Sequence, residues 1–143
     1  MELRINTGAQ VIPIVRDGQQ VGTISVNPYD VGFVDKFYRA LTNYETLAAD
    51  IADQMAALKQ KDVGGVIALT LRVADQVRAD IDNLFGPGTA DLIIGPGAAG
   101  TPDIYAQFYN GLSELIGPER RQQMEQYLPE GDELAGGDGA QDA

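Results

Sequence analysis

The sequence predicts a mainly α fold of the α+β type, in which an N-terminal β-hairpin is followed by a long helical hairpin and a shorter C-terminal helix. Strand-like residues flank an Asp17-Gly18 pair, and three later stretches repeat apolar residues at steps of three and four. A chain of 143 residues is the size of one ordinary domain. We therefore expect one domain over 1–128, with the β-hairpin over 1–27 and the helical body over 28–128.

The N-terminal residues 3–26 are expected to form β structure. Residues 11–15 are strand-like, Asp17-Gly18 favours a two-residue turn, and apolar residues continue over 21–26. Pro13 has no N–H to donate to a ladder, so its strand is expected at an edge. A ribbon of two or three strands is marginal in isolation, and it must pack on the helices or on another chain.

The first long helix is expected to begin within residues 27–30. Either Asn27 or Asp30 can cap its free N–H groups, and Pro28 suits the first turn. Its apolar residues recur at heptad spacing: Val34, Phe37, Leu41, Tyr44, Ala48, Ile51, Met55 and Leu58. Over residues 59–65 the helix either ends and turns or continues with a weak point.

A second helix is expected to pair with the first as an antiparallel hairpin. Its apolar positions are Val66, Thr70, Val73, Val77, Ile81 and Leu84. Gly86 fits a left-handed C-cap, and Pro87 fits a stop.

A third helix is expected from Thr101, as N-cap, and Pro102, at the first helical position. Its apolar face comprises Ile104, Tyr105, Phe108, Leu112, Leu115 and Ile116. Gly117-Pro118 is expected to stop it, with a short helix to about Leu128 after the stop. Residues 129–143 carry five acids, no base and one large apolar residue, so we expect a disordered acidic tail.

Composition argues against several functions. A formal charge of −11 opposes binding to nucleic acid and to anionic membranes. The chain lacks both histidine and cysteine, which removes the commonest general base, the commonest metal ligand and thiol nucleophiles. We find no signal peptide and no apolar run of the roughly 20 residues that a membrane span needs, so cytoplasm is the expected location.

Two groups of residues suggest chemistry, and for both a structural role is favoured. Gly95-x-Gly97-x-x-Gly100 follows an apolar run, but Thr101 caps a helix that starts after the last glycine, whereas a dinucleotide-binding fingerprint places that glycine inside the helix. The carboxylates Asp50 and Asp53, and Asp75 and Asp82 near Arg78, fit a solvated helix face. We therefore expect no enzyme, no cofactor and no metal site.

Aromatic residues crowd the first half of the first long helix: Tyr29, Phe33, Phe37, Tyr38 and Tyr44. They form either a core with half-buried tyrosines or a protein-binding surface, where Tyr and Phe are enriched.

The order of features resembles the small tail-region proteins of long-tailed bacteriophages, some of which are tail assembly chaperone-like. The resemblance covers roughly residues 20–116 and rests on Val26-Asn27-Pro28, on residues 33–38 and on the block IDNLFGPGT at 81–89. Ile93-Ile94-Gly95 departs from the related "(I/V)FG" element because it lacks the Phe. The resemblance implies a protein that protects or recruits the tape measure protein during tail assembly, in the host cytoplasm.

Three functions follow as alternatives. The leading one is an assembly chaperone that binds a helical partner, for which the tape measure protein is the candidate. The expected contact residues are Phe33, Phe37, Tyr38, Leu41 and Tyr44. A second copy of the chain competes for the same surface, as a homo-oligomer. The rival function is a structural subunit, in the minor tail or at the head-tail junction, whose hairpin adds to a neighbour's sheet. The third is a small enzyme that uses carboxylates.

Overall fold

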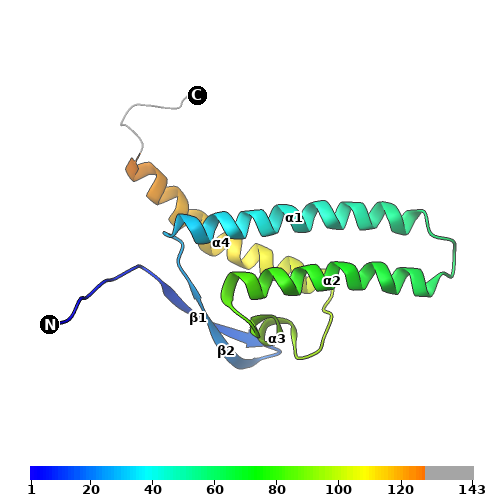
Figure 1. Cartoon of the computed structure of the whole chain (residues 1–143), viewed down its shortest axis with the longest axis horizontal. Coiled ribbons are helices and arrows are strands. Elements are labelled where there is room, and N and C mark those ends of the chain that lie inside the picture. Colours follow the sequence, from blue (N-terminus) through cyan, green and yellow to red (C-terminus); the bar gives the residue numbers. More distant parts are fainter. Residues whose placement is uncertain (128–143) are drawn as a thin grey trace, which may run out of the picture.

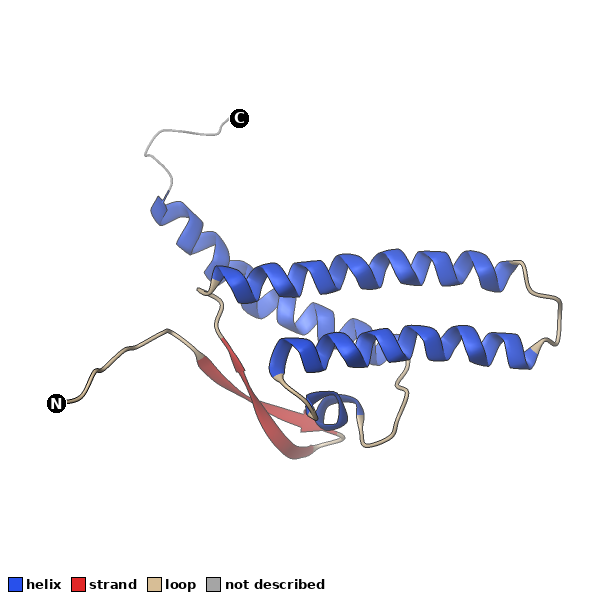
Figure 2. Ribbon diagram, viewed as in Figure 1, coloured by secondary structure: helices blue, strands red, loops and turns tan. Residues whose placement is uncertain are grey.

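The structure is a computed structural model that describes residues 1–127 (Figure 1). The elements in order are β1 (Gln10–Arg16), β2 (Gln19–Val26), α1 (Val31–Ala56), α2 (Val63–Phe85), α3 (Thr89–Ile94) and α4 (Pro102–Tyr127). Helices α1 and α2 form an antiparallel pair, and the β-hairpin and α3 lie below one end of it (Figure 2). The predicted mainly α fold class is confirmed. The predicted acidic tail over 129–143 lies outside the described residues.

The β-hairpin closes through Asp17 and Gly18, whose φ angles are 54° and 81°. Two successive positive φ angles match the twist of the strands that such a turn connects. Strand structure begins only at Gln10, so the prediction is wrong for residues 3–9, which have no strand beside them within the described chain. Pro13 lies in an edge strand, as predicted, because the sheet formed by the described residues has two strands.

Local side chains set the ends of the helical hairpin. Asp30 caps α1 by accepting a hydrogen bond from the N–H of Gly32 at 2.9 Å. Helix α1 ends at Ala56, and Asp62 caps α2 by accepting from the N–H of Gly65 at 2.9 Å. Of the two alternatives for residues 59–65, the first therefore holds: the helix ends and the chain turns.

A core of buried side chains joins the sheet to all four helices. Its members are Ile24, Val26, Val34, Phe37, Ala74, Val77, Ile81, Ala90, Ile94, Tyr105, Tyr109, Leu112 and Ile116. Among the described residues, neither this core nor the hydrophobic side chains packed against it include any residue between 45 and 72. The far half of the predicted seam thus lies outside this cluster, where α1 and α2 extend beyond the sheet (Figure 1), although Ile51 within it is itself buried.

The apolar run Leu92–Ile94 belongs to α3, which packs against the hairpin and α2. Arg16 of β1 donates hydrogen bonds to the carbonyl oxygens of Asp91 and Leu92 near the C-terminal end of α3. The Asp91 carbonyl also accepts from the N–H of Gly95 at 3.0 Å. The left-handed conformation predicted for Gly86 is found instead at Gly88, immediately before α3, whereas Gly86 combines a positive φ with an extended ψ.

Arg78 and Asp82 tie α2 to α3 and to the loop that follows, so the prediction of a solvated face is wrong for these two residues. The Arg78 guanidinium pairs with the Asp91 carboxylate and donates to the carbonyl of Ala98 at 2.7 Å. The Asp82 carboxylate accepts a hydrogen bond from the N–H of Ala90 at 2.8 Å. Free backbone groups at the start of α3 and in the following loop require such partners.

Helix α4 begins as predicted, with Thr101 Oγ1 accepting from the N–H of Ile104 at 3.3 Å and Pro102 at the first position. It does not stop at Gly117-Pro118 and runs to Tyr127 as a helix of 26 residues, the same length as α1. A proline inside a helix removes one backbone hydrogen bond and also crowds the residue before it. Glycine at position 117 has no Cβ, which reduces the second of these costs.

Candidate protein-interaction surfaces

The five residues predicted to bind a partner do not form an open surface. Phe37 is fully buried, and Phe33, Leu41 and Tyr44 are partly buried against the core. Of the five, only Tyr38 is classed as exposed. These residues therefore do not form an open aromatic stripe, and partner binding through them stays a prediction that would require the core to open.

Aromatic side chains of α4 cover this part of α1. The Tyr109 ring stacks on Tyr44 with ring centroids 4.8 Å apart and lies 6.3 Å from Phe37. Phe108 meets Tyr109 edge-on at 5.0 Å and Phe85 of α2 at 6.3 Å. The aromatic residues thus form a cluster that joins α1, α2 and α4, which agrees with the alternative of a core with half-buried tyrosines.

Tyr109 is the central residue that the sequence analysis missed. It is 2% exposed and contacts aromatic rings on both sides. It lies four residues after Tyr105 and three before Leu112, and both of those belong to the predicted apolar face of α4. Helical spacing therefore carried the signal that would have found it.

Two buried polar atoms lie on the inner sides of α2 and α4. Asp80 Oδ2 and the Tyr109 hydroxyl have no hydrogen-bond partner within the described part of the chain. Burial raises the pKa of Tyr109, with smaller contributions from Asp80 and Tyr44. Burial also raises the pKa of Asp80, although the hydrogen bond from Gln76 at 2.9 Å opposes this shift. A phenol with a raised pKa is a poor base near neutral pH.

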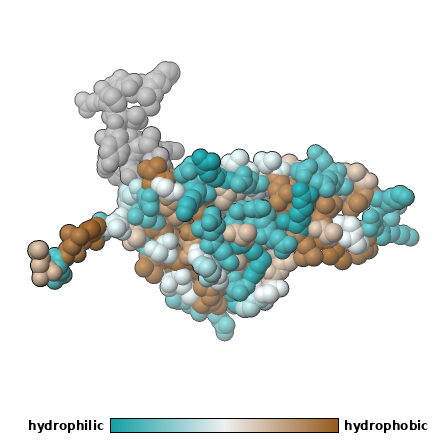
Figure 3. Space-filling model, viewed as in Figure 1, coloured by the Kyte–Doolittle hydropathy of each residue, from teal (hydrophilic) through white to brown (hydrophobic). Residues whose placement is uncertain are grey.

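The first half of α2 presents a row of exposed apolar side chains, here named the tip ridge. Its members are Val63, Val66, Ile67 and Leu71, which are between 43% and 64% exposed. Three of them are spaced four residues apart, so they lie along one row of the helix surface. Hydrophobic surface is visible at this end of the molecule in the space-filling view (Figure 3).

A hollow of about 450 Å³ lies beside the tip ridge, between the end of α1 and the start of α2. Met55 and Leu58 line one side of it, and Val63, Val66 and Ile67 line the other. Residues 54–71 contain two lysines and one aspartate, which gives a net charge of +1, whereas the whole chain carries −11. The tip therefore lacks the negative charge that dominates the chain.

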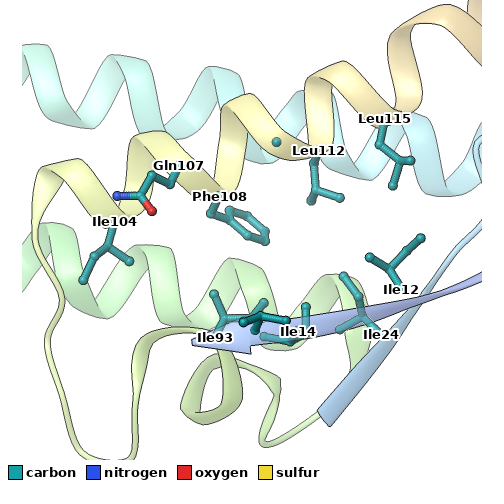
Figure 4. Close-up of a pocket in the computed structure, with 11 residues that line it drawn as sticks. Ile12, Ile14, Ile24, Ile93, Ile104, Gln107, Phe108, Leu112 and Leu115 are labelled. Atoms are coloured by element: carbon teal, nitrogen blue, oxygen red, sulfur yellow. The ribbon is translucent and has the colours of Figure 1, made fainter. Parts of the chain in front are cut away.

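A second apolar hollow, here named the hairpin groove, lies between the β-hairpin and α4 (Figure 4). Its volume is about 320 Å³. Ile12, Ile14 and Ile24 of the hairpin face Phe108, Leu112 and Leu115 of α4 across it, with Ile93 of α3 at the floor. Gln107 is the polar side chain among its lining residues, and none of the lining residues is charged.

The glycine motif lies in a structural setting that does not match a nucleotide site. The Gly95–Gly100 segment is a loop between α3 and α4, as predicted, and the residues before it form a helix where a dinucleotide fingerprint needs a strand. Residues 1–127 contain no group of three or more acidic, histidine or cysteine side chains placed to hold a metal ion. No helix in the described part of the chain is long and apolar enough to cross a membrane.

Comparison with protein-family models, with curated proteins and with solved structures gives no match for this chain.

Proposed function

We propose that this protein is an assembly factor that binds an amphipathic helix of another protein, in the manner of a tail assembly chaperone-like protein of a long-tailed bacteriophage. The tape measure protein is the proposed partner. The observation that carries the proposal is the tip ridge, a row of exposed apolar side chains on a helix that projects beyond the core.

The spacing of the tip ridge suits a helical partner. Residues four apart form a ridge that packs into the groove between the corresponding rows of a second helix. Val63, Ile67 and Leu71 span eight residues, which is about 12 Å along α2. A partner helix with apolar residues at i, i+3 or i+4, and i+7 would cover this length.

The hollow beside the ridge and the local charge also favour a partner helix. Side chains of the partner can enter the space between Met55 and Val66, and these contacts would bury apolar atoms that now face water. Lys59, Lys61 and Asp62 are the charged residues that line the hollow, with a net charge of +1. We therefore expect an amphipathic partner helix whose flanking residues are neutral or acidic, because acidic side chains at the rim would meet these lysines.

Co-expression with the tape measure protein tests the proposal. We expect the two proteins to co-purify, and we expect amide hydrogen exchange of residues 58–72 to slow in the complex. Ile67→Asp should abolish co-purification because it places a charge in the contact. Ala79→Asp introduces the same charge at an exposed position of α2 away from the ridge, so it should leave binding unchanged.

Two results would remove support for this function. One is the absence of co-purification with the unmodified chain. The other is a complex that forms equally well with Ile67→Asp and shows protection only in α1 over residues 29–46, which would point back to the aromatic stripe.

A structural subunit is the second candidate, and the edges of the β-hairpin favour it. Both strands of the two-stranded sheet have a free edge among the described residues, and such an edge can pair with a strand of a neighbouring subunit. Mass spectrometry of purified virions separates the two functions. A chaperone is absent from finished particles, whereas a structural subunit is present in them.

A further inference from the structure

The residues before β1 form an extended arm, here defined as residues 1–9. Leu3 and Ile5 are 86% and 72% exposed. They alternate with Glu2 and Arg4, which pair with each other at 2.8 Å. Alternation of apolar and polar residues is typical of a strand with one buried face, yet no strand lies beside the arm in the described chain. The arm therefore has the pattern of a strand whose neighbour is missing.

The base of the arm is fixed in a direction that leads away from the chain's own sheet. The Asn27 side chain donates a hydrogen bond to the carbonyl of Thr7 at 3.0 Å. A Cβ atom on Gly8 would lie 2.9 Å from the Tyr29 ring, so the backbone packs closely against that ring. Beyond these contacts the arm projects from the body (Figure 2). In this arrangement Leu3 and Ile5 do not reach the hairpin groove of the same chain.

The hairpin groove has the shape and chemistry that the arm's apolar residues require. An apolar cavity of about 150 Å³ can hold a benzene ring, and the groove is about 320 Å³ in volume. Its α4 side runs from Ile104 to Leu115, which is about 17 Å along the helix. The apolar positions from residue 1 to Ile5 cover about 13 Å in an extended strand. The groove can therefore take in the apolar residues of one arm.

We infer that the arm of one copy of this chain docks into the hairpin groove of a second copy, with Leu3 and Ile5 between β1 and α4. Identical exchange in both directions closes a two-fold dimer. The Glu2 and Arg4 side chains of the arm cancel in charge, and the groove has no charged lining residue, so no repulsion between side chains at the contact opposes entry of a second copy's arm. Two bodies that carry −11 each can thus meet at a neutral contact.

Side-chain burial, more than backbone pairing, holds the arm in this arrangement. The arm lies along β1, which supplies Ile12, Ile14 and Val15 to the groove. Pro13 removes one N–H donor from that strand, so a continuous ladder cannot form along it. This inference goes beyond the proposed function, because it uses a different surface and a different partner, and its test needs no tape measure protein.

Sedimentation and light scattering of the full chain test the exchange. We expect a dimer whose dissociation constant rises at least about 100-fold in Leu3→Asp/Ile5→Asp, because each charge would have to enter an apolar groove. Glu2→Gln/Arg4→Gln changes the other face of the arm and should leave the dimer intact. Equal association of both double variants would overturn the inference, as would a chain that stays monomeric in concentrated solution.

Disulfide trapping locates the contact, since the chain has no cysteine of its own. An Ile5→Cys copy mixed with a Leu115→Cys copy should form a disulfide between the two chains under mild oxidation. Ile5→Cys mixed with Ala79→Cys is the matched control and should not react. Absence of the first disulfide would overturn the inference. So would a bond within one monomeric chain that carries both Ile5→Cys and Leu115→Cys, because the arm would then fill its own groove.

Discussion

Tyr109→Phe removes a buried hydroxyl and leaves the aromatic ring in place. The residue is 2% exposed, and its hydroxyl has no hydrogen-bond partner within the described residues. Burial of a hydroxyl without a partner costs roughly 1–3 kcal/mol. A phenylalanine ring keeps the contacts with Phe37, Tyr44 and Phe108. We therefore expect the free energy of unfolding to rise by about 1 kcal/mol.

Tyr109→Ala provides the contrast because it removes the ring as well. The three aromatic contacts are lost and a cavity opens between α1 and α4, so the free energy of unfolding should fall by about 3–5 kcal/mol. The opposite signs of the two variants distinguish the contribution of the ring from that of the hydroxyl.

Urea unfolding followed by circular dichroism measures both effects. Tyr38→Phe is the control, because Tyr38 is exposed and its change should lie within about 0.5 kcal/mol of zero. A loss of about 1 kcal/mol or more in Tyr109→Phe would refute the reasoning. The hydroxyl would then hold a hydrogen bond in solution, and Asp80 Oδ2 is the buried acceptor expected to receive it.

Three further predictions concern α1 to α3. Asp80→Asn should raise the free energy of unfolding at pH 7, because burial raises the pKa of Asp80 and so disfavours its charged form. Unfolding measured over a range of pH should show this difference disappear as the pH falls through the raised pKa, because the native carboxyl then becomes protonated. Ile51→Asp should unfold the protein, since Ile51 is 4% exposed, whereas Ile67→Asp, at a position that is 53% exposed, should change the free energy of unfolding by about 0.5 kcal/mol or less in the same urea assay. Asp82→Ala should cost about 1–2 kcal/mol in that assay and speed amide exchange at Ala90, whose N–H loses its acceptor.

The sequence predicted well those features that depend on residues close together in the chain. Asp17-Gly18 fixes the hairpin turn, Asp30 and Thr101 cap helices, and the steps of three and four mark the apolar face of each long helix. Each of these signals acts within a few residues through backbone angles or local hydrogen bonds. They were sufficient for the fold class and for most element boundaries.

The candidate surfaces depend on contacts between distant segments, so they could be predicted less well from the sequence. An apolar heptad predicts that one face of a helix is apolar, but it does not predict which element covers that face. Phe37 was expected either in a core or on a protein-binding surface and is buried under Tyr109, while Val66 was expected in a seam and is exposed. Both outcomes follow from the position of α4, which covers the first half of α1 and leaves the far end of the helical hairpin outside the core.

The contacts around α3 also separate what the local sequence predicts from what the fold decides. Arg78 and Asp82 look like surface neighbours along one helix, because residues three and four apart share a face. Only the fold places Asp91 and the N–H of Ala90 within their reach, because the partners lie 13 and 8 residues further along the chain, on the other side of the turn after α2. The sequence by itself determined the hairpin turn, the starts of the long helices and their apolar faces, but not α3 or the end of α4. The tertiary structure decided which of those faces are covered, because coverage depends on packing between segments that the local pattern does not describe.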